Sequence, residues 1–278
     1  MPANLPELLE LLTLEPLDDR LFRGPQPRQS LMPRMFGGQV AAQALVAAQH
    51  TVPEDRRVHS LHSYFILGGD PSIPTVYDVE DVRDGGSFTT RRVAARQHGA
   101  IIFYMTASFQ KLEDGFDHQD PMPDVLPPDE CPSIVDLLSQ ESPEAGEFWS
   151  QEWAAADVRR APCEDRATQR MWFRLNGELE DNRTMRTALL TYYSDLTLLG
   201  PTLRPHGYRV SAPEVQVASL DHTIWFHRSV HANQWFLYDQ HSPSASHGRG
   251  LALASVFAES GELVASIAQE GLIRPVSA

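Results

Sequence analysis

The 278-residue chain contains only two cysteines, Cys131 and Cys163. They sit in no metal-ligand or redox spacing, so the sequence indicates neither a zinc site nor a disulfide framework. Long apolar runs are also missing. The longest mainly apolar stretch of helix-forming residues, Val40 to Ala48, is far too short to cross a bilayer. We therefore expect no stable membrane insertion and no metal.

Positive charge is scarce as well. Lys and Arg number 23 against 37 Asp and Glu, which gives a net charge of -14. Nucleic-acid binders neutralise phosphates with a surplus of Lys and Arg, so the composition argues against that class. The first residues, Met1 to Glu7, lack the basic region and apolar run of a signal peptide, and Val276-Ser277-Ala278 is not a peroxisomal tripeptide. The expectation is a cytoplasmic protein.

The chain divides into three parts by composition. Apolar residues make up 42% of the chain, enough for one large domain or two domains with real cores. From Glu113 onwards the sequence turns acidic and rich in proline. We predict an N-terminal domain over 1–112, a largely irregular bridge over 113–165 with one short helix near Ile134 to Ser139, and a C-terminal domain over 166–278.

The two outer parts resemble each other. Val58-His59-Ser60-Leu61-His62 matches Val217-Ala218-Ser219-Leu220-Asp221 at an offset of 159 (217 minus 58). Met105 to Ser108 matches Ser266 to Gln269 more weakly, at an offset of 161 (266 minus 105). A nearly constant offset over some fifty residues indicates an internal duplication.

Each repeat begins with one predicted helix. In the first, Gln39 to Ala48 is apolar on nearly every side, which is typical of a helix buried all round. In the second, apolar residues fall at helical spacing over Thr184 to Leu198. Strand-like segments follow each helix. One buried helix wrapped by an antiparallel sheet, occurring twice, predicts an α+β double hotdog with two sheets that each wrap one central helix.

Six ordered blocks carry a resemblance to a known family. The similarity extends from about Leu21 to Arg274 and weakens only in the bridge. These blocks look like the bacterial acyl-CoA thioesterase II family: Phe36 to Val40, His59 to Phe65, Asp84 to Phe88, Phe103 to Phe109, Leu220 to His227, and Gln269 to Arg274. The resemblance implies hydrolysis of medium- to long-chain acyl-CoA.

The resemblance also implies three catalytic residues, all in the second repeat. They are Asp195 on the second helix, Ser219 on the next strand and Gln269 on the last strand. Hydrolysis of a thioester needs a nucleophilic water, an acceptor for its proton and groups that orient it. A carboxylate, a hydroxyl and an amide can supply these functions without a metal, a cofactor or a covalent intermediate.

The substrate-binding candidates rest on weaker grounds. Gly38 begins a helix whose backbone N–H groups can receive an anion or a thioester oxygen, although tight packing explains this glycine equally well. His59 is placed near the active site by the resemblance alone. Arg91 and Arg249 occupy related positions in the two repeats and are candidates for coenzyme A phosphates, or for salt bridges at the rim.

Other readings of the residues stay open. His59 and His62 are expected to face opposite sides of one strand, and Asp221 and His222 likewise, which argues against a shared metal or a dyad. Asp221 is expected to be a structural hydrogen-bonder. The alternatives to a thioesterase are a hotdog hydratase or dehydratase and a non-catalytic acyl-CoA or lipid binder. Fused hotdogs are expected to pair further, as a homodimer or homotetramer.

Overall fold

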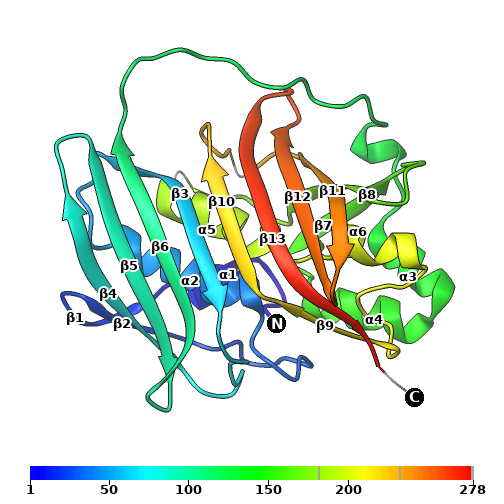
Figure 1. Ribbon diagram of the computed structural model, residues 1–278, viewed down its shortest axis with the longest axis horizontal. Coiled ribbons are helices and arrows are strands. Elements are labelled where there is room, and N and C mark those ends of the chain that lie inside the picture. The colour runs from blue at the N-terminus through cyan, green and yellow to red at the C-terminus, as the bar shows by residue number, and fades with distance from the viewer. Residues whose placement is uncertain (181, 232, 277–278) are drawn as a thin grey trace.

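A single large antiparallel sheet with helices packed on one side makes up most of the molecule (Figure 1). The computed structural model describes residues 1–180, 182–231 and 233–276. Residues 277 and 278, considered above for targeting, lie outside the described residues. No helix within the described ranges is both long and apolar enough to span a membrane.

The first repeat contains a buried helix followed by four long strands. Its elements are α1 (Leu5–Leu12), β1 (Glu15–Asp18), β2 (Leu21–Gly24), α2 (Gly37–Gln49), β3 (Arg56–Phe65), β4 (Thr75–Asp84), β5 (Phe88–Gln97) and β6 (Ala100–Lys111). The prediction of a helix buried all round is confirmed, because every residue of α2 from Gly38 to Ala48 is buried. The short helix α1 was not predicted.

The bridge is more ordered than predicted. It contains the short helix η1 (Pro128–Glu130), two helices and one strand: α3 (Ile134–Glu141), α4 (Pro143–Glu152) and β7 (Ala156–Ala161). The predicted short helix near Ile134 to Ser139 is confirmed as α3, whereas α4 was not predicted. Ser133 and Ser142 cap the two helices by accepting hydrogen bonds from Val135 N and Ala145 N. Strand β7 joins the edge of the sheet, beside the second repeat.

The second repeat follows the same plan. Its elements are β8 (Thr168–Leu175), α5 (Arg183–Ser194), α6 (Gly200–Leu203), η2 (Arg204–His206), β9 (Val215–Ser219), β10 (Asp221–Phe226), β11 (Phe236–Ser246), β12 (Arg249–Ala258) and β13 (Leu263–Pro275). Helix α5 ends at Ser194, four residues earlier than predicted, and the chain turns there before α6. This early end places Asp195 just after the helix.

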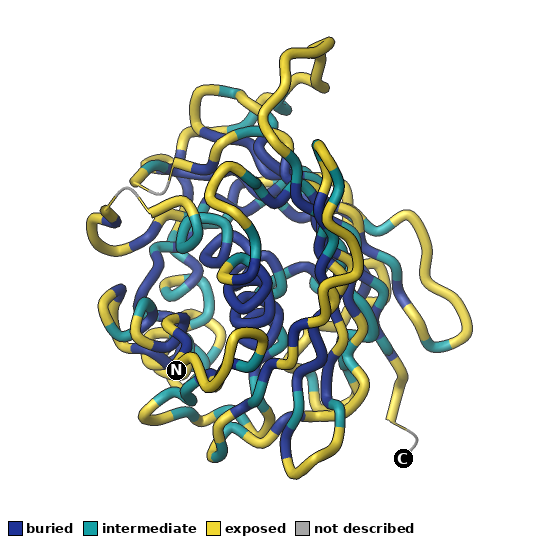
Figure 2. The backbone as a smooth tube through the Cα atoms, turned by 90° about the vertical axis from the view of Figure 1, so that its left-hand side faces the viewer, coloured by how far each residue is buried: buried dark blue, intermediate teal, exposed yellow. Residues whose placement is uncertain are grey.

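The two predicted sheets are continuous with each other. Strand order is β1-β2-β4-β5-β6-β3-β10-β13-β12-β11-β8-β7, and β9 pairs with the end of β13. The join is the antiparallel pair of β3 and β10, in which Leu61 lies opposite Ile224. Each half still wraps its own helix, as a double hotdog does. Figure 2 shows buried helix on the inner side of the curved sheet.

The helices α2 and α5 lie side by side in close contact. A Cβ added at Gly38 would lie 2.1 Å from the backbone oxygen of Tyr192, so only glycine allows the two backbones to approach this closely. The rings of Phe36 and Tyr192 meet edge to face, with centroids 5.1 Å apart. The start of α2 is thereby held against the end of α5.

Candidate active site

Asp195 lies where the two helices meet. It is the C-cap of α5, with helical backbone angles, and the residue is half-buried. The phenol of Tyr238 on β11 donates a hydrogen bond of 2.7 Å to the carbonyl of Ser194, which fixes the end of the helix. A buried strand thus determines where this carboxylate sits.

The three predicted catalytic residues converge. Gln269 Nε2 donates hydrogen bonds to Asp195 Oδ1 (2.8 Å) and to Ser219 Oγ (2.7 Å). Ser219 Oγ in turn donates to Asp195 Oδ1 at 3.2 Å. Gln269 is fully buried, whereas Asp195 and Ser219 are only partly buried. The set is therefore closed to solvent at Gln269 and accessible to solvent at Asp195 and Ser219.

The first repeat contributes the start of α2 to the same site. A Cβ added at Gly37 would lie 2.5 Å from Asp195 Oδ2, and the backbone N–H of Gly38 hydrogen-bonds the carboxylate. The N-cap residue Phe36 makes no side-chain hydrogen bond to the start of α2, so the carboxylate of Asp195 satisfies an amide that would otherwise lack a partner. The positive end of the helix dipole also favours the ionised carboxylate.

Two opposing effects act on the protonation of Asp195. Burial raises the pKa of its carboxyl above the ordinary value, and this is the largest effect. The neighbouring His222 and the hydrogen bonds from Gln269, Ser219 and Gly38 lower that pKa in part. A carboxylate with a raised pKa is a stronger base than one in water, as proton abstraction requires.

His222 belongs to this site, and sequence reasoning assigned it no part there. It is fully buried on β10, with Nδ1 2.6 Å from Gln269 Oε1. A buried core histidine was one of the expected roles for His222. Its hydrogen bond with Gln269 was not predicted. Asp221 next to it accepts a hydrogen bond of 2.7 Å from the backbone of Glu270, which confirms the expected structural role.

Only Gly38 among the four substrate-binding candidates touches the three predicted catalytic residues. Its N–H is already engaged by Asp195, so it does not stand free for a substrate oxygen. His59 lies on the opposite, outer face of the sheet, where its Nε2 is 2.8 Å from Ser108 Oγ. Its strand bulges between Val58 and Ser60, so His59 shares that face with His62. The expectation that the two face apart is wrong.

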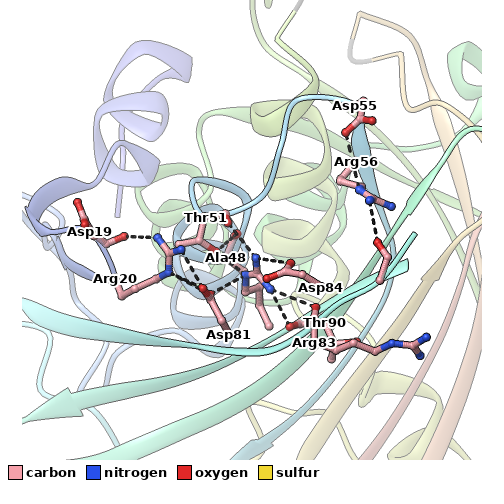
Figure 3. Close-up of polar contacts among 12 residues, drawn as sticks. Asp19, Arg20, Ala48, Thr51, Asp55, Arg56, Asp81, Arg83, Asp84 and Thr90 are labelled. Atoms are coloured by element: carbon pink, nitrogen blue, oxygen red, sulfur yellow. Dashed lines mark hydrogen bonds and ion pairs between the residues drawn. The ribbon is translucent and has the colours of Figure 1, made fainter. Parts of the chain in front are cut away.

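The two arginines occupy different environments. Arg249 is exposed on β12 and pairs with Glu270 at 3.0 Å. Arg91 is 2% exposed, and its guanidinium pairs with Asp81 (2.9 Å) and Asp84 (2.8 Å). Figure 3 shows these two carboxylates with Thr51 in a network on the first repeat. Since its donors are taken by protein partners, Arg91 is placed to hold strands together rather than to contact a phosphate.

Known proteins match the chain along nearly its whole length. The family model for the acyl-CoA thioesterase N-terminal domain matches residues 25–110, and the model for acyl-CoA thioesterase matches residues 150–272. Acyl-CoA thioesterase 2 of Haemophilus influenzae is 39% identical over 99% of both chains. Human acyl-coenzyme A thioesterase 8 is 39% identical over 98% of this chain and 91% of its own.

Solved structures agree on the fold. A hot dog fold protein of unknown function from Alicyclobacillus acidocaldarius, 22% identical, superposes with a TM-score of 0.78 and covers 96% of this chain and 98% of its own. The fold is thus a hotdog. The acyl-CoA thioesterase II TesB2 from Mycobacterium marinum, 44% identical, has a TM-score of 0.82 and covers 96% of this chain and 98% of its own. The chain belongs to the acyl-CoA thioesterase family.

Proposed function

We propose that this thioesterase hydrolyses medium- to long-chain fatty acyl-CoA by direct attack of a water held by Asp195, Ser219 and Gln269. The hydrogen-bonded set of these three side chains carries the proposal. Two of them reach solvent from an otherwise buried cluster, so a water and a thioester can approach them. Residues from both repeats support the set, and its three members come from the second.

The proposed reaction begins with the water hydrogen-bonded to Asp195. Its oxygen attacks the thioester carbonyl carbon while Asp195 accepts its proton. The tetrahedral intermediate then collapses, the carbon–sulfur bond breaks, and the thiolate of coenzyme A takes up the proton that Asp195 had accepted. The products are a free fatty acid and coenzyme A, and the side chains are restored. Ser219 and Gln269 orient the water and the carboxylate throughout.

An apolar cavity supports the preference for longer acyl chains. It has a volume of about 290 Å³ and lies between η2 and the strands β9, β12 and β13, with Leu203, Val215 and Ile273 in its lining. Val215 and Ile273 lie on the inner face of the sheet, as Ser219 and Gln269 do, because side chains alternate along β9 and β13. Arg249 is among the residues that line it.

The test is thiol release from acyl-CoAs of four to eighteen carbons, followed with DTNB. We expect the highest kcat/KM on medium and long chains. Asp195→Asn should lower kcat by about 10²- to 10⁴-fold, as loss of a general base does. Asp239→Asn is the matched control, since it changes a partly buried carboxylate that pairs with Arg170 on another strand. Equal rates for Asp195→Asn and wild type would remove Asp195 from the mechanism.

The hydratase and dehydratase alternative requires a histidine that touches the substrate. His222 is near Asp195, but it is fully buried and both ring nitrogens have protein partners. It therefore has no free nitrogen to offer a substrate. Hydration of enoyl-CoA without thiol release from acyl-CoA would reverse this choice. A protein that binds acyl-CoA and releases no thiol would instead be the non-catalytic binder.

We also propose that the chain pairs with further copies as a homodimer or homotetramer. The outer face of the sheet exposes large apolar side chains near the β3–β10 join, with Tyr64 62%, Trp225 39% and Tyr104 38% exposed. Burial of such side chains favours association. Light scattering on the purified protein should give a mass of two or four chains, and a single-chain mass would refute the proposal.

A further inference from the structure

The side chain of His222 links the catalytic set to the end of α5. Its ring is fully buried, with Nδ1 2.6 Å from Gln269 Oε1 and Nε2 2.7 Å from Ser194 Oγ. His222 and Gln269 both face inward on neighbouring strands, one residue beyond the paired Thr223 and Ala268. The ring has no open side toward a substrate.

Counting protons fixes the roles of the two ring nitrogens. Both protons of the Gln269 amide nitrogen are committed, one to Asp195 and one to Ser219. The amide oxygen of Gln269 can only accept, so Nδ1 of His222 must carry a proton. Burial lowers the pKa of His222, which favours the neutral ring. In a neutral ring Nε2 then carries no proton and accepts from the Ser194 hydroxyl; the oxygen of that hydroxyl is also 2.8 Å from the carbonyl of Thr191, so this tautomer requires its single proton to turn from that carbonyl to Nε2.

The orientation of the Gln269 amide depends on this tautomer. A side-chain amide fits its cavity almost equally well when rotated by half a turn, which exchanges its oxygen and nitrogen. The rotated form would turn a carbonyl oxygen toward the carboxylate of Asp195, and oxygen would meet oxygen. It would also leave the amide N–H groups facing the N–H of His222. The protonated Nδ1 therefore selects the productive orientation.

We infer that His222 is a positioning residue: it donates from Nδ1 to Gln269 and so keeps the amide N–H groups of Gln269 directed at Asp195 and Ser219. The inference rests on the proposed function of these three residues. The first repeat supports the specialised role, because Ser63 stands at the position matching His222 (222 minus 159). Ser63 Oγ donates to the backbone carbonyl of His222 at 2.7 Å and holds only the strand.

Substitutions at position 222 separate positioning from packing. His222→Asn keeps a nitrogen near the place of Nδ1, whereas His222→Gln puts its amide near Nε2, and His222→Leu has no donor at all. We expect kcat to fall about 10- to 100-fold in His222→Leu and His222→Gln. KM should stay within about threefold of wild type, and His222→Asn should recover kcat to within about threefold. Ser63→Ala, which disturbs the same strand, should leave kcat unchanged.

A double-variant comparison tests whether His222 acts through Gln269. Gln269→Ala alone should lower kcat strongly, and adding His222→Leu to it should cause no further loss. If the double variant instead loses kcat by the product of the two single losses, His222 has a general packing role, and the inference is overturned. So would a His222→Leu enzyme with kcat within twofold of wild type while Gln269→Ala is impaired. An unimpaired Gln269→Ala enzyme would instead remove Gln269 from the proposed mechanism, and the inference would fall with it.

A measurement on the unmodified protein covers the case in which the variants do not fold. Long-range ¹⁵N–¹H correlation spectra of histidine-labelled protein distinguish the two neutral tautomers. We expect His222, assigned by comparison with His222→Asn or with backbone correlations, to carry its proton on Nδ1 at neutral pH. A proton on Nε2 alone would leave Gln269 without its donor and would overturn the inference.

Discussion

Gly37→Ala tests whether the first repeat positions the carboxylate of Asp195, the proposed general base. The new Cβ would lie 2.5 Å from Asp195 Oδ2, and ordinary contact begins at 3.4 Å. The carboxylate must therefore move by up to 0.9 Å (3.4 minus 2.5). The nearby Phe65 ring, at 2.8 Å, can rotate away, but the Asp195 carboxylate is held by hydrogen bonds from Ser219, Gln269 and the N–H of Gly38. A misplacement of about 1 Å costs on the order of 10²-fold in rate.

We expect kcat for thiol release to fall about 100-fold in Gly37→Ala, with little loss of stability. Alanine stabilises a helix by roughly 0.5–1 kcal/mol relative to glycine, and overpacking costs about 1–3 kcal/mol. These effects largely offset each other, so the unfolding midpoint should change by only a few degrees. Gly86→Ala is the control, since nothing lies within 4 Å of its Cβ. A folded Gly37→Ala enzyme with kcat within threefold of wild type would refute the reasoning.

Three further predictions follow from the structure. In the thiol assay, Ser219→Ala should lower kcat at least tenfold, because Ser219 binds Gln269. Ser60→Ala should not lower kcat, because Ser60, the matching residue of the first repeat, lies on the outer face of the sheet. Burial raises the pKa of Asp195, so kcat/KM should be full above that raised pKa and fall as the pH drops through it, at a higher pH than for an ordinary aspartate, whose pKa is about 3.9; an acid limb at or below about 3.9 would contradict this. Arg91→Ala should cost about 2 kcal/mol of unfolding free energy in urea without changing KM, whereas the exposed Arg92→Ala should cost less than about 0.5 kcal/mol.

Local patterns were enough to predict much of the fold. The run of small apolar residues in α2 indicates burial on all sides, and the offset of 159 shows two copies of one unit. The continuity of the sheet was not predictable in this way, since it depends on how the edge strands β3 and β10 meet. The ordered bridge was missed although Ser133 and Ser142 are good helix caps, because its prolines and acids suggested irregular chain.

Irregularities in the strands limit how well the site can be predicted from side chains that point alternately to the two faces of a sheet. In the first repeat the bulge falls between Val58 and Ser60, so Ser60 faces outward. In the second, the alternation breaks at Leu220, between β9 and β10, so Ser219 still faces inward with Gly271. Two matching serines thus face opposite sides of the sheet. Simple alternation cannot show this.

The place of His222 in the site also depends on tertiary register. The alternation of β10 predicts that His222, Ile224 and Phe226 share the buried face, as they do. Contact with Gln269 follows only from the pairing of β10 with β13. The three proposed catalytic residues were inferred from the family resemblance, whereas a residue that acts through another carries no comparable sequence signal.

Direct attack by water, with no acyl-enzyme, is most directly tested by rapid-quench intact-mass measurement during turnover of palmitoyl-CoA. An Asp195 that acts as a base leaves the protein mass unchanged at every time point, and thiol release is linear from the first turnover. An Asp195 that acts as a nucleophile would give a burst of about one thiol per chain and a mass increase equal to the acyl group. We predict the unchanged mass and the linear release. An acyl adduct on Asp195 would contradict the account.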